Sequence, residues 1–197
     1  MTDIDICNIA MGWLAGEQVA DISVAPTSTE EQVCAAIYGP CRMATLEQRE
    51  WSFAVLRRKL TLASPTPSSD IIDAYDGRTA FAKPSDLIRV LSVSESAKFV
   101  GDIEWLVEGP YIWAPANEAF LRYIYNVTDT TLFSAGFTHT LAARIAMIGA
   151  IPITGSKEHM DLMANIHNFM LDIASTVDGM QASNQPPKKI VSTIRVR

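Results

Sequence analysis

The spacing of apolar side chains changes its period twice along the chain, which predicts helices at both ends and strands between them. Residues 3–15 carry apolar side chains on one side and are followed by Gly16, which predicts a short helix. Residues 28–62 open with Ser28 and Glu31 in the spacing of a capping box and continue with apolar residues at three- and four-residue intervals. Because Pro40 has no N–H to donate, we expect this helix to break near Gly39 and Pro40, which makes the segment a helical hairpin or a bent pair.

Residues 71–128 follow the two-residue period of strands instead. A lead-in at residues 71–75 is followed by a run of branched residues from Leu87 to Val93, and apolar residues alternate with acids over residues 103–108. Gly109 and Pro110 turn the chain before a short strand over residues 111–114, and residues 121–127 form the last strand. We therefore expect a mainly antiparallel sheet that is covered on one face, with a meander as its simplest connection.

Two further helices are predicted after the strands. The first, over residues 133–151, has Arg144 as its only full charge, so we expect most of its faces to be covered and Pro152 to end it. Ser156 caps the second helix, which we expect to run to about residue 178. Its apolar stripe consists of Leu162, Ile166, Phe169, Ile173 and Val177, and its polar ribbon consists of Asp161, Asn165, Asn168 and Asp172.

These elements predict an α+β protein. Residues 1–63 and 133–183 form a helical bundle, made of the N-terminal hairpin and the two C-terminal helices, into which a β-sheet half over residues 64–132 is inserted. Residues 184–197 contain a Pro-Pro pair, four cations and no acid, and are rich in branched side chains, so we expect an extended basic arm; a disordered tail is the alternative. The arm residues expected to bind a partner are Lys188, Lys189, Ile190, Val191, Ile194, Arg195, Val196 and Arg197.

Composition favours an oligomer. Hydrophobic residues make up 48% of the 197 residues and charged residues only 19%, which leaves less charge on the surface than a free monomer usually has. The net charge of −6 argues against a general duplex-DNA binder.

Cys7, Cys34 and Cys41 cannot all pair within one chain, so we expect reduced core thiols. With no apolar run of about 18 residues and an acidic N-terminus, we expect a chain that is neither exported nor membrane-spanning.

Catalytic chemistry has little support in the sequence. The histidines at 139, 159 and 167 match no metal-binding spacing, no glycine cluster suits a phosphate, and no serine is marked as a nucleophile. We therefore expect no catalytic residue, no metal and no cofactor. Interfaces with other molecules are the functional sites that remain to be considered. In a ring, the polar ribbon could line a channel with negative charge that repels DNA. An ordinary solvated helix face fits the same residues.

Short motifs in a consistent order along almost the whole chain resemble one known family. The motifs are Cys7-Asn8-Ile9-Ala10 with Gly12, Tyr38 and Cys41-Arg42 before Trp51-Ser52-Phe53-Ala54, Pro84-Ser85-Asp86 with Arg89-Val90-Leu91-Ser92-Val93, Tyr123-Ile124-Tyr125 with Val127-Thr128-Asp129, and Leu141-Ala142-Ala143-Arg144-Ile145-Ala146 before Ile153-Thr154. In these the chain resembles the tail tube adaptor family of short-tailed phages, also called tail tubular protein A.

The resemblance implies a structural, non-enzymatic virion protein of the phage tail, assembled in the host cytoplasm. It implies a homo-oligomeric ring, twelve subunits in this family, that joins the portal protein to the tail nozzle protein, offers a seat for tail fibres, and lets DNA pass through its lumen without specific binding or a membrane. We expect the arm to reach the portal or a neighbouring adaptor. The alternative is a nucleic-acid-binding module that uses the basic arm and the cluster Arg57, Arg58 and Lys59, and such binding would fall steeply with salt.

Overall fold

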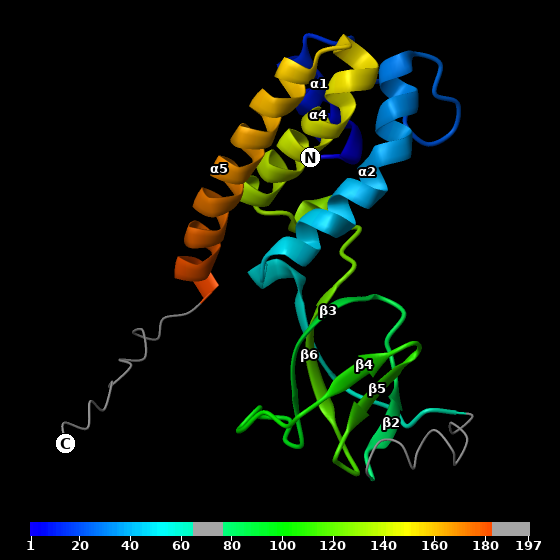
Figure 1. The fold of residues 1–197 in the computed structure, drawn as a ribbon, viewed down its shortest axis with the longest axis vertical. Helices are drawn as coiled ribbons and strands as arrows, with labels where there is room; N and C mark the ends of the chain where they lie inside the picture. Colours follow the sequence, from blue (N-terminus) through cyan, green and yellow to red (C-terminus); the bar gives the residue numbers. More distant parts are fainter. Residues whose placement is uncertain (65–76, 183–197) are drawn as a thin grey trace, which may run out of the picture.

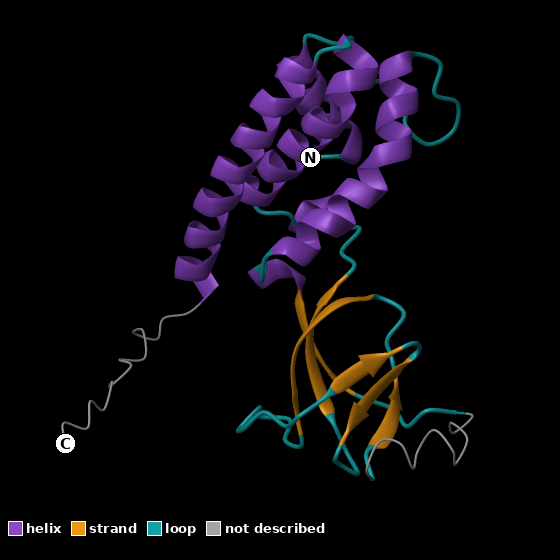
Figure 2. Cartoon of the chain, in the orientation of Figure 1, coloured by secondary structure: helices purple, strands orange, loops and turns teal. Residues whose placement is uncertain are grey.

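A computed structural model describes residues 1–64 and 77–182 and divides them into two halves stacked along the long axis of the molecule. Figures 1 and 2 show the helices at one end and all the strands at the other. The helices come from both ends of the chain and the strands from its middle, so the α+β class with an inserted sheet half is confirmed. The predicted lead-in at residues 71–75 and the predicted arm at residues 184–197 lie outside the described residues.

The helical half is built around α4 (Ala135–Thr154). This helix contacts the three others, α1 (Asp3–Leu14), α2 (Thr29–Gln48) and α5 (Lys157–Ala182), whereas α5 packs chiefly on α4. Among the described residues, α4 is also the one helix that is long and apolar enough to cross a bilayer, and 56% of its most apolar window is buried inside the bundle. Its apolar character is thus largely used in packing against neighbouring helices.

Hydrogen bonds at its N-terminus fix where α2 begins. The side chain of Ser28 accepts the N–H of Glu31, and the carboxylate of Glu31 accepts the N–H of Ser28, as the sequence predicts. The same carboxylate accepts the N–H of Thr27 at 2.7 Å and the N–H of Ala20 at 3.1 Å. These N–H groups, from Thr27, Ala20 and Ser28, favour the ionised form and lower the pKa of Glu31 to about 2. The loop before α2 is therefore tied to the first turn of the helix.

The segment from residue 28 to residue 60 differs from the predicted helical hairpin. It forms one helix, α2, then a 3-10 turn (Ser52–Ala54) and a strand, β1 (Val55–Lys59). Pro40 lies inside α2, and the ribbon of this helix bends along its length without breaking (Figure 1). The ring of Pro40 is exposed, while Cys34, Tyr38 and Cys41 hold the opposite face of the helix in the core. Burial of that face thus maintains the helix on both sides of the proline.

The strands form two three-stranded antiparallel sheets. One has the order β1, β6 (Phe120–Tyr125), β3 (Leu87–Ser94), and the other has the order β2 (Thr79–Ala82), β5 (Tyr111–Ala114), β4 (Leu106–Glu108). The predicted strands at residues 87–93 and 111–114 are present, but the predicted meander is wrong because β6 pairs with both β1 and β3. Since β1 belongs to the first sheet, the sheet half begins at Val55 and not at residue 64.

Each half has its own apolar core. Side chains of both sheets meet between them, and the larger fully buried ones are Phe81, Val93, Ile112, Leu121 and Tyr123. In the helical half, Phe137 of α4 makes edge contacts with Trp51 and Phe133, with ring centroids 5.0 and 4.7 Å apart. The indole N–H of Trp51 donates to the carbonyl of Thr45 at 2.9 Å. Trp51 precedes β1, so this aromatic cluster joins the helical half to the start of the sheet half.

The turn between α4 and α5 sets them side by side. Pro152 does not end α4 as predicted, because the helix continues for two residues and closes at Gly155, whose φ of 67° is left-handed. The side chain of Ser156 then accepts the N–H of His159 at 3.3 Å, which is the predicted cap of α5. From this cap, α5 runs past residue 178 to Ala182.

Candidate interaction surfaces

The predicted polar ribbon of α5 forms one exposed strip. The side chains of Asp161, Asn165, Asn168 and Asp172 are all exposed. Asp172 accepts a hydrogen bond from the guanidinium of Arg49 at 2.8 Å, an ion pair at the surface. After Lys157, the first residue of α5, the helix contains no lysine or arginine. The structure therefore brings the four predicted residues together on a face without cations of its own.

Four of the five residues of the predicted apolar stripe of α5 are exposed, and Ile166 is partly buried. Leu162, Phe169, Ile173 and Val177 are 52%, 67%, 49% and 48% exposed; these four residues are called the α5 stripe below. The face of α5 that is buried consists instead of Met163, His167, Leu171, Ala174 and Asp178. Periodicity shows which faces of a helix are apolar, but it does not show which of them finds a neighbour. Since α5 packs chiefly on α4, one neighbour leaves much of its wide apolar arc uncovered.

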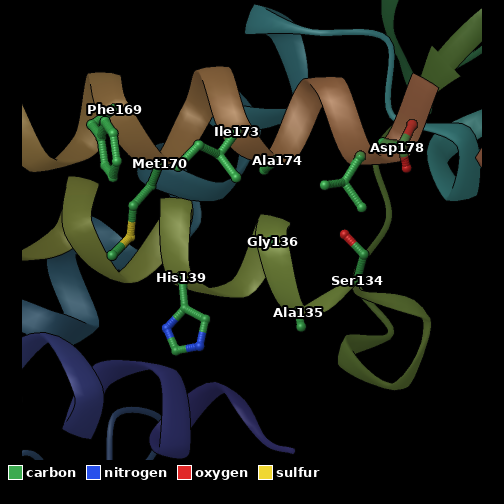
Figure 3. A pocket seen from close by; sticks show the side chains of 10 residues that line it. Ser134, Ala135, Gly136, His139, Phe169, Met170, Ile173, Ala174 and Asp178 are labelled. Carbon is green, nitrogen blue, oxygen red and sulfur yellow. The ribbon is translucent and has the colours of Figure 1, made fainter. Parts of the chain in front are cut away.

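A groove of about 570 Å³ runs beside the α5 stripe, between α5 and the N-terminal part of α4 (Figure 3). Phe169, Ile173 and Val177 line it from α5, and Ala135 and His139 line it from α4. The two helices touch at its floor, where a Cβ built on Gly136 would lie only 2.7 Å from the Cβ of Ala174. The stripe and this groove together form one continuous apolar surface, which the described residues leave open.

A serine, a histidine and an aspartate line this groove, but they do not form a catalytic triad. The Oγ of Ser134 accepts the N–H of Phe137 at 3.2 Å as the cap of α4. The carboxylate of Asp178 accepts the N–H and the hydroxyl of Ser52 at 2.8 and 2.7 Å. Figure 3 shows the imidazole of His139 directed away from both side chains. Ser134 and Asp178 therefore have structural roles, and no proton relay joins the three side chains.

A second groove, of about 240 Å³, lies between α2 and α4. Its lining residues are Ala36, Ile37, Pro40, Cys41, Ala44, Arg144 and Ile148, and it is called the α2/α4 groove below. Arg144 is the only cation of α4, and its Nε and Nη1 atoms are buried with no hydrogen-bond partner in the described part of the chain. Buried guanidinium nitrogens without an acceptor are costly, and the sequence gives no sign of them beyond the single charge on an apolar helix.

His167 occupies the contact between α5 and α4. Its ring is 3% exposed, and its Nδ1 lies 3.1 Å from the carbonyl oxygen of Thr140. Burial lowers the pKa of His167, and the nearby charge of Arg144 acts in the same direction. The ring is therefore neutral in the folded chain and donates its Nδ1–H to Thr140.

The basic cluster of residues 57–59 lies on β1, where successive side chains point to opposite faces of the sheet. Lys59 pairs with Glu118 at 2.8 Å, and Arg58 lies 3.7 Å from Asp86. The guanidinium of Arg57 lies over the ring of Phe99, 5.2 Å from its centroid. The three cations are therefore divided between two faces, and two of them already have acidic partners.

The cysteines and histidines form no metal site in the described residues. Cys7, Cys34 and Cys41 are free and buried in the helical core, as the sequence predicts, and burial raises the pKa of Cys41 to about 11. His139 and His159 are exposed and His167 is buried. Within residues 1–64 and 77–182, no group of three or more histidine, cysteine, aspartate or glutamate residues is placed to hold a metal ion.

The other predicted contact residues are those of the arm: Lys188, Lys189, Ile190, Val191, Ile194, Arg195, Val196 and Arg197. They lie outside the described residues. In comparisons with known proteins, no protein-family model matches the chain and no curated protein matches it.

Proposed function

We propose that this chain is the subunit of a ring that joins a phage portal to the tail nozzle, as its resemblance to the tail tube adaptors implies. The observation that carries the proposal is the surface of α5. This helix of 26 residues exposes an apolar stripe next to a polar ribbon that has acids and amides but no cation. Exposed apolar stripes of this kind mark interaction sites on soluble proteins.

The two strips of α5 suit two different surroundings in such a ring. The α5 stripe needs a covering protein surface, since four large apolar side chains in a row are costly to leave in water. The ribbon of Asp161, Asn165, Asn168 and Asp172 needs water, and its carboxylates would repel a passing DNA backbone. A subunit with its stripe in a seam and its ribbon toward the lumen satisfies both requirements.

The sheet half supports the part of the proposal that concerns the nozzle and the fibres. The chain enters it at Val55 and leaves it at Tyr125, both at the end next to the helices, so within the described part of the chain the far end is left for other contacts (Figure 1). We propose that the helical half and the arm contact the portal and neighbouring subunits, and that the sheet half faces the nozzle and the fibres.

Light scattering of the purified chain, alone and mixed with its candidate portal at moderate and high salt, tests the proposal. We expect a stoichiometric complex that forms with the portal and survives high salt, because apolar seams are not weakened by screening. A chain that does not bind the portal at either salt concentration contradicts the adaptor function. A second measurement removes residues 184–197, and portal binding that is unchanged by this truncation would refute the role proposed for the arm.

One observation favours nucleic-acid binding as the second candidate. Arg57 and Arg122 lie directly opposite each other in the β1–β6 register, which places both on the same face of the sheet. Arg122 also pairs with Glu50, so the face is only partly free of acids. Binding of this kind would show as a complex with DNA at low salt that dissociates steeply as salt rises, whereas adaptor assembly would not.

A further inference from the structure

We propose that neighbouring subunits join head to tail, with the α5 stripe of one chain packed on the α2/α4 groove of the next. This inference rests on the proposed ring and names the two surfaces that form its seam. The partner of each surface is a second copy of this chain. Three features of the described residues carry it: the direction of the two surfaces, their apolar character, and the charge of Arg144.

The two surfaces lie on different sides of the bundle. The groove beside the α5 stripe is bordered by His139 of α4, whereas the α2/α4 groove is bordered by Arg144 and Ile148 of the same helix. At 3.6 residues per turn, positions 139 and 144 are roughly 140° apart around α4. A surface on one side that binds a different surface on the other side produces a heterologous contact, which repeats from subunit to subunit and closes into a ring when the rotation between subunits divides a full turn. An isologous dimer would need one surface that is complementary to itself.

Both surfaces offer large apolar side chains that the described chain leaves uncovered. The α5 stripe contains Phe169, which is 67% exposed, and the α2/α4 groove is lined on α4 by Ile148, which is 43% exposed. The small side chains of Ala36 and Ala44 leave the groove hollow between the larger ones. A helix with projecting Phe and Ile side chains fits such a hollow in the way that ridges of one helix pack into grooves of another.

The charge of Arg144 indicates what the partner must carry. Its Nε and Nη1 atoms are buried in the wall of the α2/α4 groove with no acceptor in the described residues, so a partner that brings carboxylate or amide oxygens would stabilise it. The α5 stripe has such a group at its N-terminal end, since the exposed Glu158 lies one turn before Leu162 on the same face, and no lysine or arginine follows Lys157 in the helix. The basic arm of residues 184–197 has the wrong sign of charge for this position.

Cysteine crosslinking of mixed chains tests the seam directly. One chain has Phe169→Cys, a second has Ile148→Cys, and the two are mixed and oxidised. We expect a disulfide-linked dimer in the mixture and none from either variant alone, because a head-to-tail contact brings position 169 of one copy to position 148 of another. Both positions are exposed, so the substitutions leave the fold intact. The matched control mixes Phe169→Cys with Val24→Cys, which is 87% exposed on a loop of the helical half, and should give no linked dimer.

The possible results separate the seam from the adaptor function. A dimer formed by Phe169→Cys alone indicates an isologous contact and overturns the proposal. So does the absence of a mixed dimer in a preparation that light scattering shows to be oligomeric, or a wild-type chain that stays monomeric with and without portal. A crosslink from Ile194→Cys in the arm to Ile148→Cys, in place of the mixed dimer, assigns the groove to the arm. A mixed dimer from a chain that does not bind the portal supports the seam and refutes only the adaptor function.

A separate measurement tests the role of Arg144 in the seam. We expect Arg144→Met to leave the isolated subunit folded, since it replaces a half-buried cation that has two buried nitrogens without an acceptor with an apolar side chain, and to weaken assembly. Assembly would then be measured by the yield of the mixed crosslink in the variant background. An unchanged yield would show that Arg144 finds no partner across the seam.

Discussion

The two C-terminal helices contain similar apolar patterns but have different surroundings. α4 contacts α1, α2 and α5, and ten of its residues are buried. α5 has α4 as its principal neighbour, and four large apolar side chains of its stripe are about half exposed or more. The apolar surface of α4 is thus largely used inside the subunit, whereas that of α5 exceeds what the subunit can cover.

This difference separates two roles of apolar residues. Side chains on α4 stabilise the fold of one chain, because folding removes them from water. Side chains of the α5 stripe contribute little to that fold and are available to bind another molecule. Substitutions on the two helices should therefore affect different measurements, and the following four predictions test this from the largest expected effect to the smallest.

The largest contrast is expected between two phenylalanines. Phe137→Ala on α4 removes a fully buried ring that contacts Trp51 and Phe133, and should lower the free energy of unfolding by about 3–5 kcal/mol. Phe169→Ala on α5 removes a ring that is 67% exposed and should change it by no more than about 0.5 kcal/mol. Urea denaturation of the dilute monomer measures both. Equal losses would show that the α5 stripe is part of the folded core.

Two aspartates on α5 give the next contrast. Asp178 is 6% exposed and accepts two hydrogen bonds from Ser52, so Asp178→Asn should destabilise the chain by about 1.5–3 kcal/mol. Asp172 is exposed and pairs with Arg49 at the surface, so Asp172→Asn should cost less than about 1 kcal/mol. The same denaturation measurement compares the two variants. A larger loss at Asp172 would contradict the view that Asp178 anchors the C-terminal part of α5.

The close approach of α4 and α5 can be tested at a glycine. In Gly136→Ala the added methyl group would lie 2.7 Å from the Cβ of Ala174, so the helices must separate, at a cost of about 1–3 kcal/mol. Gly12→Ala on α1 is the matched control, since nothing lies within 4 Å of the added atom, and it should stabilise the chain by up to about 1 kcal/mol. Thermal unfolding should therefore shift in opposite directions. A neutral Gly136→Ala would mean that the α4–α5 contact adapts easily.

The smallest effect concerns pH and His167. Its pKa is lowered in the folded chain, so the unfolded chain binds more protons as pH falls below about 6.5. The stability from the neutral ring is thus present above that pH and is lost progressively below it. His167→Asn keeps a donor for the carbonyl of Thr140 without the titration, so its unfolding midpoint in urea should fall less between about pH 7 and pH 5 than the wild-type midpoint does. Parallel profiles would contradict this.

Much of the fold could be predicted where local signals are strong. Ser28 with Glu31 and Ser156 with the N–H of His159 mark helix starts because a side chain near the end of a helix satisfies its free N–H groups. The strand at residues 87–94 is evident from its branched residues. Sequence patterns did not predict the structure where the conformation of a segment depends on another segment far away in the chain. The residues from Val55 to Lys59 form a strand because β6 lies beside them, and nothing local requires it.

The candidate surfaces divide in the same way. The polar ribbon of α5 follows from the sequence, because four polar side chains at helical spacing must share a face whatever lies around them. The exposure of the α5 stripe does not follow from the sequence, since Phe169 and Ile173 have the spacing of core residues. The same holds for Arg144, whose single charge is visible in the sequence but whose lack of an acceptor is not.

By itself, the sequence determined the type and approximate limits of most helices and strands, the insertion of a sheet between helices, and the polar face of α5. These follow from backbone hydrogen bonding and side-chain period, which act over a few residues. Only the tertiary structure decided that α2 continues through Pro40, that β6 is the central strand of its sheet, and that the α5 stripe is uncovered. Each of these depends on which apolar surface finds a neighbour, and that is set by the packing of segments far apart in the chain.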